Sequence, residues 1–223
     1  MYDVKKSLHA VLDTLPSGVR LVAISKFHPA EYIEAAYAEG QRIFGESHEQ
    51  ELRVKHEQLP KDIEWHFIGH LQTNKVKYIA PYVSMIEAVD SLKLLQEINR
   101  QAERCGRVIR VLLELHIAEE ATKYGLTLDA CRELLEGGEW RSMTHVQICG
   151  LMMMASFVDD QEQIRREMQT AADFFDEVKM KYFVNDDAFC ERSWGMSDDY
   201  RIACETRSTM VRIGTAIFGP RIY

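Results

Sequence analysis

A lysine at the end of a strand-like apolar run is the first residue of this chain that could do chemistry. The run VRLVAIS covers residues 19–25, and Lys26 follows it. Strand alternation places Val22, Ile24 and Lys26 on one face. If that face is enclosed, desolvation favours the neutral amine, which can form a Schiff base with an aldehyde. On this residue alone, the alternative is a lysine that has simply reached solvent.

An arginine near the C-terminus gives the lysine a possible partner. In the segment TMVRIGTAIFG, residues 209–219, Met210, Arg212 and Gly214 share one face. An arginine on an apolar strand face requires a hydrogen-bonding or oppositely charged partner. Gly214, followed by Thr215, lets a ligand approach the backbone closely, and in many barrels this strand region binds phosphate.

Ser197, in the segment GMSDD at residues 195–199, is a third candidate. It can cap the following helix, whose free N–H groups favour an anion. On spacing alone Ser197 is only a helix cap, but next to Gly214 and Thr215 it completes a phosphate-binding cup. The candidate residues together predict a site for a phosphorylated aldehyde, held by a lysine, an arginine and this cup.

The elements that must position these residues alternate along the chain as short β-rich runs and helical segments. The predicted strands cover residues 19–25, 41–46, 63–69, 81–89, 107–117, 146–155, 193–197 and 209–219. The predicted helices cover residues 3–15, 29–39, 48–58, 73–79, 90–105, 127–137 and 159–180, and one more begins near residue 198.

Eight strand-then-helix units predict an α/β fold, a (β/α)8 TIM barrel preceded by an N-terminal helix. We expect residues 1–223 to form this single domain. An open doubly wound sheet is the alternative, but the first strand-helix junction, SKFHPAE, lacks a glycine-rich dinucleotide fingerprint. In a barrel the site lies at the C-terminal ends of the strands, which is where Lys26 falls.

Composition limits the partners and the compartment. The chain has 223 residues and a formal net charge of -8, which disfavours nucleic acid as a partner. Its five cysteines include no CxxC pair, so we expect reduced thiols. No apolar run approaches membrane-spanning length, and the first fifteen residues are amphipathic and carry acids, unlike a secretory signal. We therefore expect a cytoplasmic protein with no membrane partner.

Two further patterns favour structural roles. His66 and His70 have HxxxH spacing but no HExxH glutamate, so hydrogen-bonding histidines are favoured over metal ligands. The run Met152, Met153 and Met154 is expected to pack around a core or cofactor. The helix at 159–180 is expected to bury one apolar stripe, made by Ile164, Met168, Ala171, Phe175 and Val178.

Six motifs, taken in order, resemble those of a known family. They are VAISK, FGESHEQE, WHFIGHLQTNK, GLM, WGMSDD and VRIGTAIFG. They are similar to the pyridoxal phosphate homeostasis proteins, the YggS or PROSC family, from about residue 20 to residue 223. The resemblance implies the alanine-racemase-like barrel of fold-type III pyridoxal phosphate proteins. It also implies a role in vitamin B6 homeostasis without established catalysis.

Carried over to this chain, the resemblance implies that Lys26 holds pyridoxal 5'-phosphate as an aldimine and that Arg212 faces the pyridine nitrogen. Ser197, Gly214 and Thr215 are expected to hold the phosphate, with Met196 lining the site. Four positions depart from the family pattern: Ser47, His48, His116 and Arg207. Ser47 is expected to lie near the cofactor, where its short side chain loses a polar contact.

The same resemblance limits the chemistry. A permanently cationic arginine disfavours protonation of the ring nitrogen and so weakens the cofactor as an electron sink. Racemases of this fold type add a β domain and a tyrosine base across a dimer, whereas this chain ends at Tyr223, so we expect a monomer. The main hypothesis is a carrier or buffer of the cofactor that supplies apoenzymes. A racemase or lyase that uses Lys26 as a base, and an interaction protein regulated by the cofactor, are the alternatives.

Overall fold

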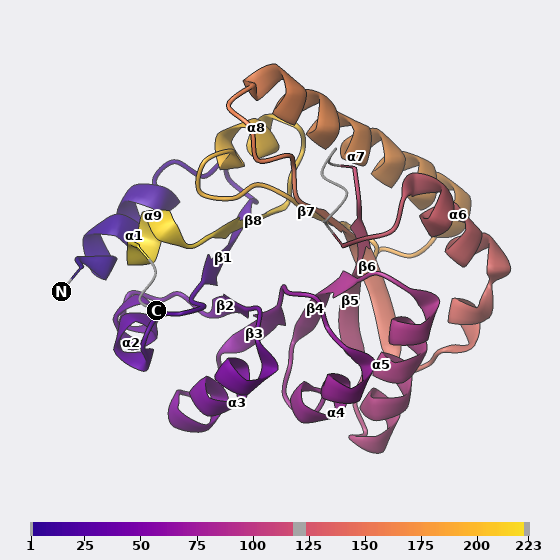
Figure 1. Ribbon diagram of the computed structural model, residues 1–223, viewed down its shortest axis with the longest axis horizontal. Helices are drawn as coiled ribbons and strands as arrows, with labels where there is room; N and C mark the ends of the chain where they lie inside the picture. The colour runs from indigo at the N-terminus through magenta and orange to yellow at the C-terminus, as the bar shows by residue number, and fades with distance from the viewer. Residues whose placement is uncertain (1, 118–123, 221–223) are drawn as a thin grey trace.

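The computed structural model describes residues 2–117 and 124–220 and shows a closed barrel of eight parallel strands. The strands follow one another around the barrel in chain order, and β1 pairs with β8 to close it. Figure 1 shows the helices arranged around this ring of strands. The (β/α)8 prediction is confirmed, and the open doubly wound sheet is wrong.

The strands are short, and most of them begin and end within the predicted runs. They are β1 Arg20–Ile24, β2 Ile43–Glu46, β3 Glu64–Phe67, β4 Met85–Val89, β5 Ile109–Leu115, β6 Val146–Met153, β7 Glu191–Ser193 and β8 Met210–Ile213. The helices are α1 Val4–Leu12, α2 Ala30–Ala38, α3 Glu49–Gln58, α4 Val76–Ile79, α5 Leu92–Arg104, α6 Leu128–Gly137, α7 Gln161–Tyr182, α8 Tyr200–Glu205 and α9 Thr215–Phe218. Two 3₁₀ turns, η1 Thr73–Lys75 and η2 Glu139–Ser142, complete the described elements.

Strand alternation divides the apolar residues into two layers, as predicted for β1 and β8. Val22, Ile24 and Met210 belong to a cluster inside the barrel, whereas Leu21 and Val211 pack into the layer between barrel and helices. The inner cluster as a whole contains Val22, Ile24, Met85, Ala88, Leu112, Cys149, Met152 and Met210. An inward side chain at the end of β1 or β8 therefore points toward the barrel axis.

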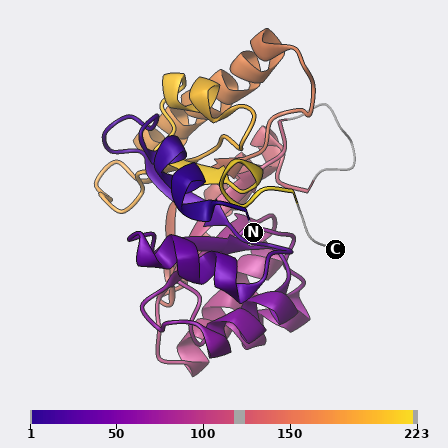
Figure 2. The same ribbon diagram turned by 90° about the vertical axis from the view of Figure 1, so that its left-hand side faces the viewer.

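The first helix, α1, and the last helix, α9, lie side by side. Figures 1 and 2 both show the indigo α1 beside the yellow α9. A Cβ on Gly219, where φ is +81°, would lie 2.8 Å from the ring of Tyr2. The predicted N-terminal helix therefore packs against the segment that follows the closing strand.

Two predicted strands near the C-terminus are wrong in part. Of the segment 193–197 only Ser193 is strand, because β7 is Glu191–Ser193 and Gly195, with φ of +96°, turns the chain. The segment 209–219 is a strand only to Ile213; Gly214 leaves the extended conformation, and α9 follows at Thr215–Phe218. Ile217 and Phe218 of that helix are buried, as the apolar residues of a core strand would be, so the hydrophobic pattern did not distinguish the helix from a strand.

A third boundary differs at β4. The prediction begins this strand at residue 81, but residues 81–84 form a turn after α4, in which the N–H of Val83 donates to the carbonyl of Ile79.

The apolar stripe predicted on α7 is confirmed, since all five of its residues are buried. Within residues 2–117 and 124–220, no helix has the length and apolar character needed to cross a bilayer.

Candidate functional site

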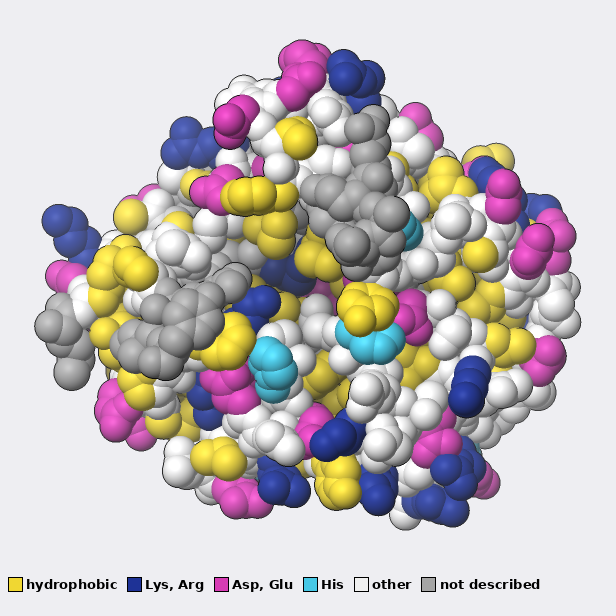
Figure 3. All heavy atoms as spheres, viewed as in Figure 1, with side chains coloured by type: hydrophobic (Ala, Val, Ile, Leu, Met, Phe, Trp, Pro, Cys, Tyr) yellow, Lys and Arg dark blue, Asp and Glu magenta, His cyan; other side chains and the backbone are white. Residues whose placement is uncertain are grey.

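A cavity of about 410 Å³ opens at the C-terminal ends of the strands. Figure 3 shows basic and histidine side chains around the hollow at the centre of this face. The structure brings all seven predicted site residues to this cavity: Lys26, Ser47, Met196, Ser197, Arg212, Gly214 and Thr215. They come from four different strand ends, so the closed barrel is what assembles them.

Lys26 lies two residues beyond the end of β1 and lines the cavity. It continues the alternation of Val22 and Ile24, whose side chains both lie inside the barrel. After Lys26 the chain turns through Phe27, a non-glycine residue with φ of +64°. The N–H of Phe27 donates to Glu51 Oε1 at 2.7 Å, and the N–H of His28 donates to the carbonyl of Ser25 at 3.1 Å. The lysine therefore sits on a tight, hydrogen-bonded turn.

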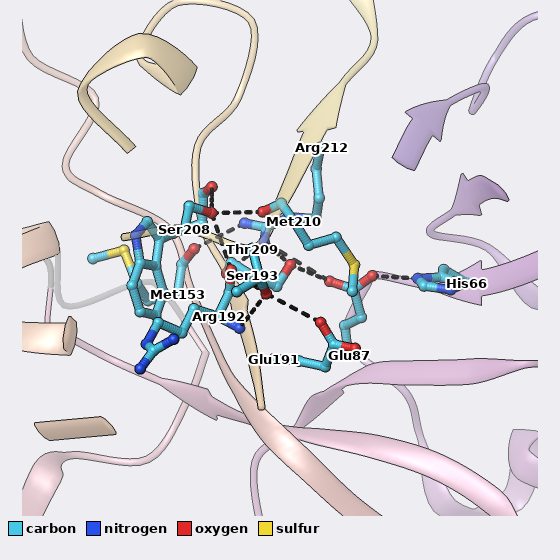
Figure 4. Close-up of polar contacts among 11 residues, drawn as sticks. His66, Glu87, Met153, Glu191, Arg192, Ser193, Ser208, Thr209, Met210 and Arg212 are labelled. Atoms are coloured by element: carbon cyan, nitrogen blue, oxygen red, sulfur yellow. Dashed lines mark hydrogen bonds and ion pairs between the residues drawn. The ribbon is translucent and has the colours of Figure 1, made fainter. Parts of the chain in front are cut away.

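Arg212 lies inside the barrel on β8, opposite Val22 of β1, and is buried. Its Nη1 donates to the carbonyl and to Oγ of Ser193, at 2.7 and 2.6 Å, and its Nη2 donates to the carbonyl of Met153 at 2.8 Å. Figure 4 shows these contacts. The guanidinium is therefore held in one orientation at the floor of the cavity, which answers the requirement for a partner.

Glu87 and His66 extend this network across the barrel. Glu87 accepts a hydrogen bond from Ser193 Oγ at 2.6 Å, and its carboxylate lies 2.6 Å from Nδ1 of His66 (Figure 4). Burial alone raises the pKa of Glu87, but His66, Arg212 and Ser193 outweigh it and hold the pKa below its ordinary value. Burial lowers the pKa of Arg212, opposed first by Glu87. Because a guanidinium titrates far above neutral pH, Arg212 remains a buried cation.

The three residues predicted to bind phosphate, Ser197, Gly214 and Thr215, lie together at the cavity, after the ends of β7 and β8. Ser197 Oγ accepts from the N–H of Ala216, at 3.4 Å, which joins the loop after β7 to the first turn of α9. A Cβ on Gly214 would lie 3.0 Å from the carbonyl oxygen of Ile24. The absence of a side chain at Gly214 therefore lets this turn approach the end of β1, beside Lys26.

The loop that carries Met196 and Ser197 is fixed by a buried acid. Asp199 Oδ1 accepts from the N–H of Met196 at 2.5 Å, and burial raises the pKa of Asp199. An amine, a fixed cation and a glycine-bounded turn thus line one cavity. These residues fit a phosphorylated pyridine aldehyde.

The opposite wall of the cavity contains residues that the sequence analysis did not predict. They include Ile68, His70, Glu114 and Tyr124. The ring of His70 stacks on Tyr124 with centroids 3.8 Å apart. Strand alternation could have identified Glu114, because it places this acid on the inward face of the apolar strand β5, where a buried charge is unfavourable.

Glu114 is an acid at this site whose pKa is raised. Its Oε2 is buried and has no hydrogen-bond partner in the described part of the chain. Burial raises its pKa to about 7, Asp90 adds to this rise, and Arg212 opposes it. Glu114 therefore changes charge near neutral pH inside the cavity.

The remaining sequence predictions divide between the cavity and its surroundings. Ser47 lines the cavity, and its Oγ lies 3.2 Å from Nδ1 of His48. His66 and His70 hydrogen-bond to Glu87 and Asp90, which confirms the hydrogen-bonding role predicted for both. Met152 packs inside the barrel and Met153 outside it, while Met154 lines the cavity, as expected for packing residues.

Arg207 departs from the family pattern at a position that favours glycine. Its φ is +67°, in the left-handed region. Its guanidinium contacts the carboxylates of Asp176, at 2.5 Å, and Asp173, at 3.2 Å, both on α7. Arg207, His48 and His116 are not part of the cavity lining. Tyr223 lies outside the described residues.

Comparison with known proteins gives close matches to this chain. Residues 4–221 match the family described as alanine racemase, N-terminal domain. The pyridoxal phosphate homeostasis protein of Aquifex aeolicus is 37% identical over 205 residues, covering 92% of this chain and 88% of that one. The human protein of the same name is 36% identical over 214 residues, covering 92% of this chain and 77% of that one.

A solved structure gives the same result in three dimensions. PipY of Synechococcus elongatus, with pyridoxal phosphate bound, superposes with a TM-score of 0.88 at 32% identity. The match covers 97% of this chain and 100% of that one. The barrel and its order of strands are therefore shared with a protein that binds pyridoxal phosphate.

Proposed function

Because this chain belongs to the alanine racemase N-terminal domain family, and within it to the pyridoxal phosphate homeostasis proteins, we propose that it binds pyridoxal 5'-phosphate at the mouth of its barrel. In this role it carries or buffers the cofactor in the cytoplasm, and it supplies apoenzymes that need it. The observation that carries the proposal is the one cavity that joins Lys26, Arg212 and the turn at Gly214.

The cofactor supplies an aldehyde, which condenses with a primary amine to form a carbon–nitrogen double bond and release water. Lys26 is the amine proposed for this bond. Ser197, Gly214 and Thr215 bind the phosphate, helped by the N–H groups that begin α9. Met196 and Ser47 line the site beside them.

Arg212 is proposed to face the pyridine nitrogen. Its hydrogen bonds to Ser193 and Met153 keep the guanidinium in place whether or not a ligand is present. A fixed cation at that position disfavours protonation of the ring and so disfavours carbanion chemistry. This supports storage of the cofactor over its use as an electron sink.

Two further features support a monomer in a reducing compartment. The five cysteines are all free, and two of them, Cys131 and Cys149, are buried. Burial raises the pKa of the Cys131 thiol to about 12, so it remains protonated. All seven predicted site residues come from this chain, in keeping with the proposed monomer.

Borohydride reduction followed by mass spectrometry tests the proposal. Wild-type protein incubated with pyridoxal 5'-phosphate should absorb visible light and, after reduction, should carry one phosphopyridoxyl group on Lys26. Lys26→Ala should abolish the label and retain weaker binding through the phosphate contacts. Lys181→Ala, at an exposed lysine on α7 paired with Glu136, is the matched control and should label normally. A wild-type protein that stays colourless and unlabelled would overturn the proposal.

A further inference from the structure

A buried ionic cluster lies directly behind the turn that carries Lys26. It consists of Glu46, the last residue of β2, together with Glu51 and Lys55 of α3. The side chain of Lys55 is only 6% exposed, and that of Glu46 is fully buried. None of the three lines the cavity, so the proposed function does not yet account for them.

Lys55 donates three hydrogen bonds in this cluster. Its Nζ lies 2.8 Å from the carbonyl of Ser25, 2.8 Å from Glu46 Oε1 and 2.6 Å from Glu51 Oε1. An ammonium group has three donors, and all three are used here. Ser25 Oγ also donates to Glu46 Oε1, at 2.6 Å. The ammonium is therefore held in one position behind β1.

This cluster contacts the backbone on both sides of Lys26. The carbonyl of Ser25 belongs to the peptide group before Lys26, and Lys55 binds it. The N–H of Phe27 belongs to the peptide group after Lys26, and Glu51 Oε1 accepts from it at 2.7 Å. Since Lys55 also binds Glu51, both peptide groups that flank Lys26 are fixed by one ion pair.

The conformation held in this way is an unfavourable one. Phe27 has φ of +64°, a region that non-glycine residues rarely adopt and that persists only where the surroundings impose it. The hydrogen bond from Phe27 to Glu51 is a contact that imposes it. Without that contact the turn is expected to relax, and the direction of the Lys26 side chain changes with it.

We propose that Glu51 and Lys55 are positioning residues, which fix the two peptide groups around Lys26 and so aim its amine into the cavity. This inference rests on the proposed function, because the amine has to meet the aldehyde of the cofactor. A misaimed amine slows formation of the covalent bond, while the phosphate contacts at Ser197, Gly214 and Thr215 are unaffected.

The test separates covalent attachment from non-covalent binding in the full-length protein. Pyridoxine 5'-phosphate, which has an alcohol in place of the aldehyde, measures binding alone. The growth of visible absorbance with pyridoxal 5'-phosphate, trapped by borohydride, measures attachment. For Glu51→Ala we expect attachment to be about tenfold slower or more, with the Kd of pyridoxine 5'-phosphate within about threefold of wild type.

Two variants serve as controls. Glu51→Gln keeps an oxygen that can accept from Phe27, so it should restore most of the attachment rate. Glu49→Ala lies on the same turn of α3 and removes a different lysine pair, to Lys75, so it should attach at the wild-type rate. The side chain of Glu51 is 23% exposed, so its substitution is expected to leave the protein folded. Lys55→Met is a second variant, which removes the other partner of the same ion pair.

The outcomes distinguish this inference from the proposed function. Attachment at the wild-type rate in Glu51→Ala, or a parallel loss of attachment and of pyridoxine 5'-phosphate binding, overturns the positioning role. Failure of the wild-type protein to form the bond at all overturns the proposed function instead. Slow attachment with intact binding, restored by Glu51→Gln, supports both.

Discussion

The guanidinium of Arg212 lies 3.8 Å from the carboxylate of Glu87 at the floor of the cavity, and both side chains are buried. Ser193 Oγ joins them, since it accepts from Arg212 and donates to Glu87 (Figure 4). Removal of one partner of a buried ion pair leaves an uncompensated charge in a medium that solvates it poorly. Loss of either charge at the floor of the cavity should therefore lower the stability of the barrel.

Glu87→Gln should destabilise the protein because it leaves the Arg212 cation without its nearest carboxylate. We expect a loss of about 3 kcal/mol in the free energy of unfolding, measured by urea denaturation. Glu136→Gln, at an exposed ion pair with Lys181, is the matched control and should have a much smaller effect. Equal effects of the two substitutions would show that the buried pair has no special role.

Gly214→Ala should weaken binding of pyridoxal 5'-phosphate. The added Cβ lies 3.0 Å from the carbonyl of Ile24, so the turn must move away from β1. We expect the Kd to rise about tenfold, which corresponds to about 1.4 kcal/mol. Gly137→Ala, where a Cβ meets nothing within 4 Å, is the control and should leave the Kd unchanged. An unchanged Kd in Gly214→Ala would mean that the phosphate does not bind at this turn.

Ser197→Ala should reduce the preference for phosphorylated ligands. The hydroxyl borders the first turn of α9 and can donate to a phosphate oxygen. A hydrogen bond to a charged group contributes about 1.5–3 kcal/mol, so we expect the ratio of the Kd values for pyridoxal and pyridoxal 5'-phosphate to fall about tenfold. Ser142→Ala, whose hydroxyl bonds Glu139 outside the cavity, should keep the wild-type ratio. A wild-type ratio in Ser197→Ala would place the phosphate elsewhere.

Glu114→Gln should change how stability depends on pH. In the folded protein the pKa of Glu114 is about 7, against an ordinary value of 4.5. Between these values the folded state binds more protons than the unfolded chain, so the free energy of unfolding falls as pH rises from 4.5 to 7. One such group contributes a slope of up to about 1.4 kcal/mol per pH unit and about 3 kcal/mol in total.

Glutamine cannot titrate, so the variant should lack this part of the decline. The measurement is urea denaturation of both proteins between pH 5 and pH 8. The unfolding free energy of wild type relative to Glu114→Gln should therefore be largest at pH 5 and smallest at pH 8. Because Glu46, whose pKa burial also raises to about 7, is present in both proteins, its effect cancels in the difference. A difference that is constant with pH would contradict the raised pKa of Glu114.

Much of the fold and of the site followed from local patterns in the sequence. Alternation along β1 and β8 placed Lys26 and Arg212 on inward faces, because side chains of an extended strand point to opposite sides in turn. The position of each residue at a C-terminal strand end then placed it at the mouth of a barrel. Lys26 and Arg212 line the cavity for this reason, and the other five predicted residues, Ser47, Met196, Ser197, Gly214 and Thr215, line it from the segments that follow β2, β7 and β8.

Element boundaries and long-range side-chain partners depend instead on how the barrel packs. The helix α9 was predicted as strand, since a short buried helix and a buried strand share an apolar composition. Glu114 reaches the cavity wall opposite Lys26 only when the barrel closes. The contacts of Lys55 with Ser25, and of Arg212 with Glu87, join residues that lie 30 and 125 positions apart. Local sequence patterns carry no information on such pairings, because they depend on which side chains the closed barrel brings together.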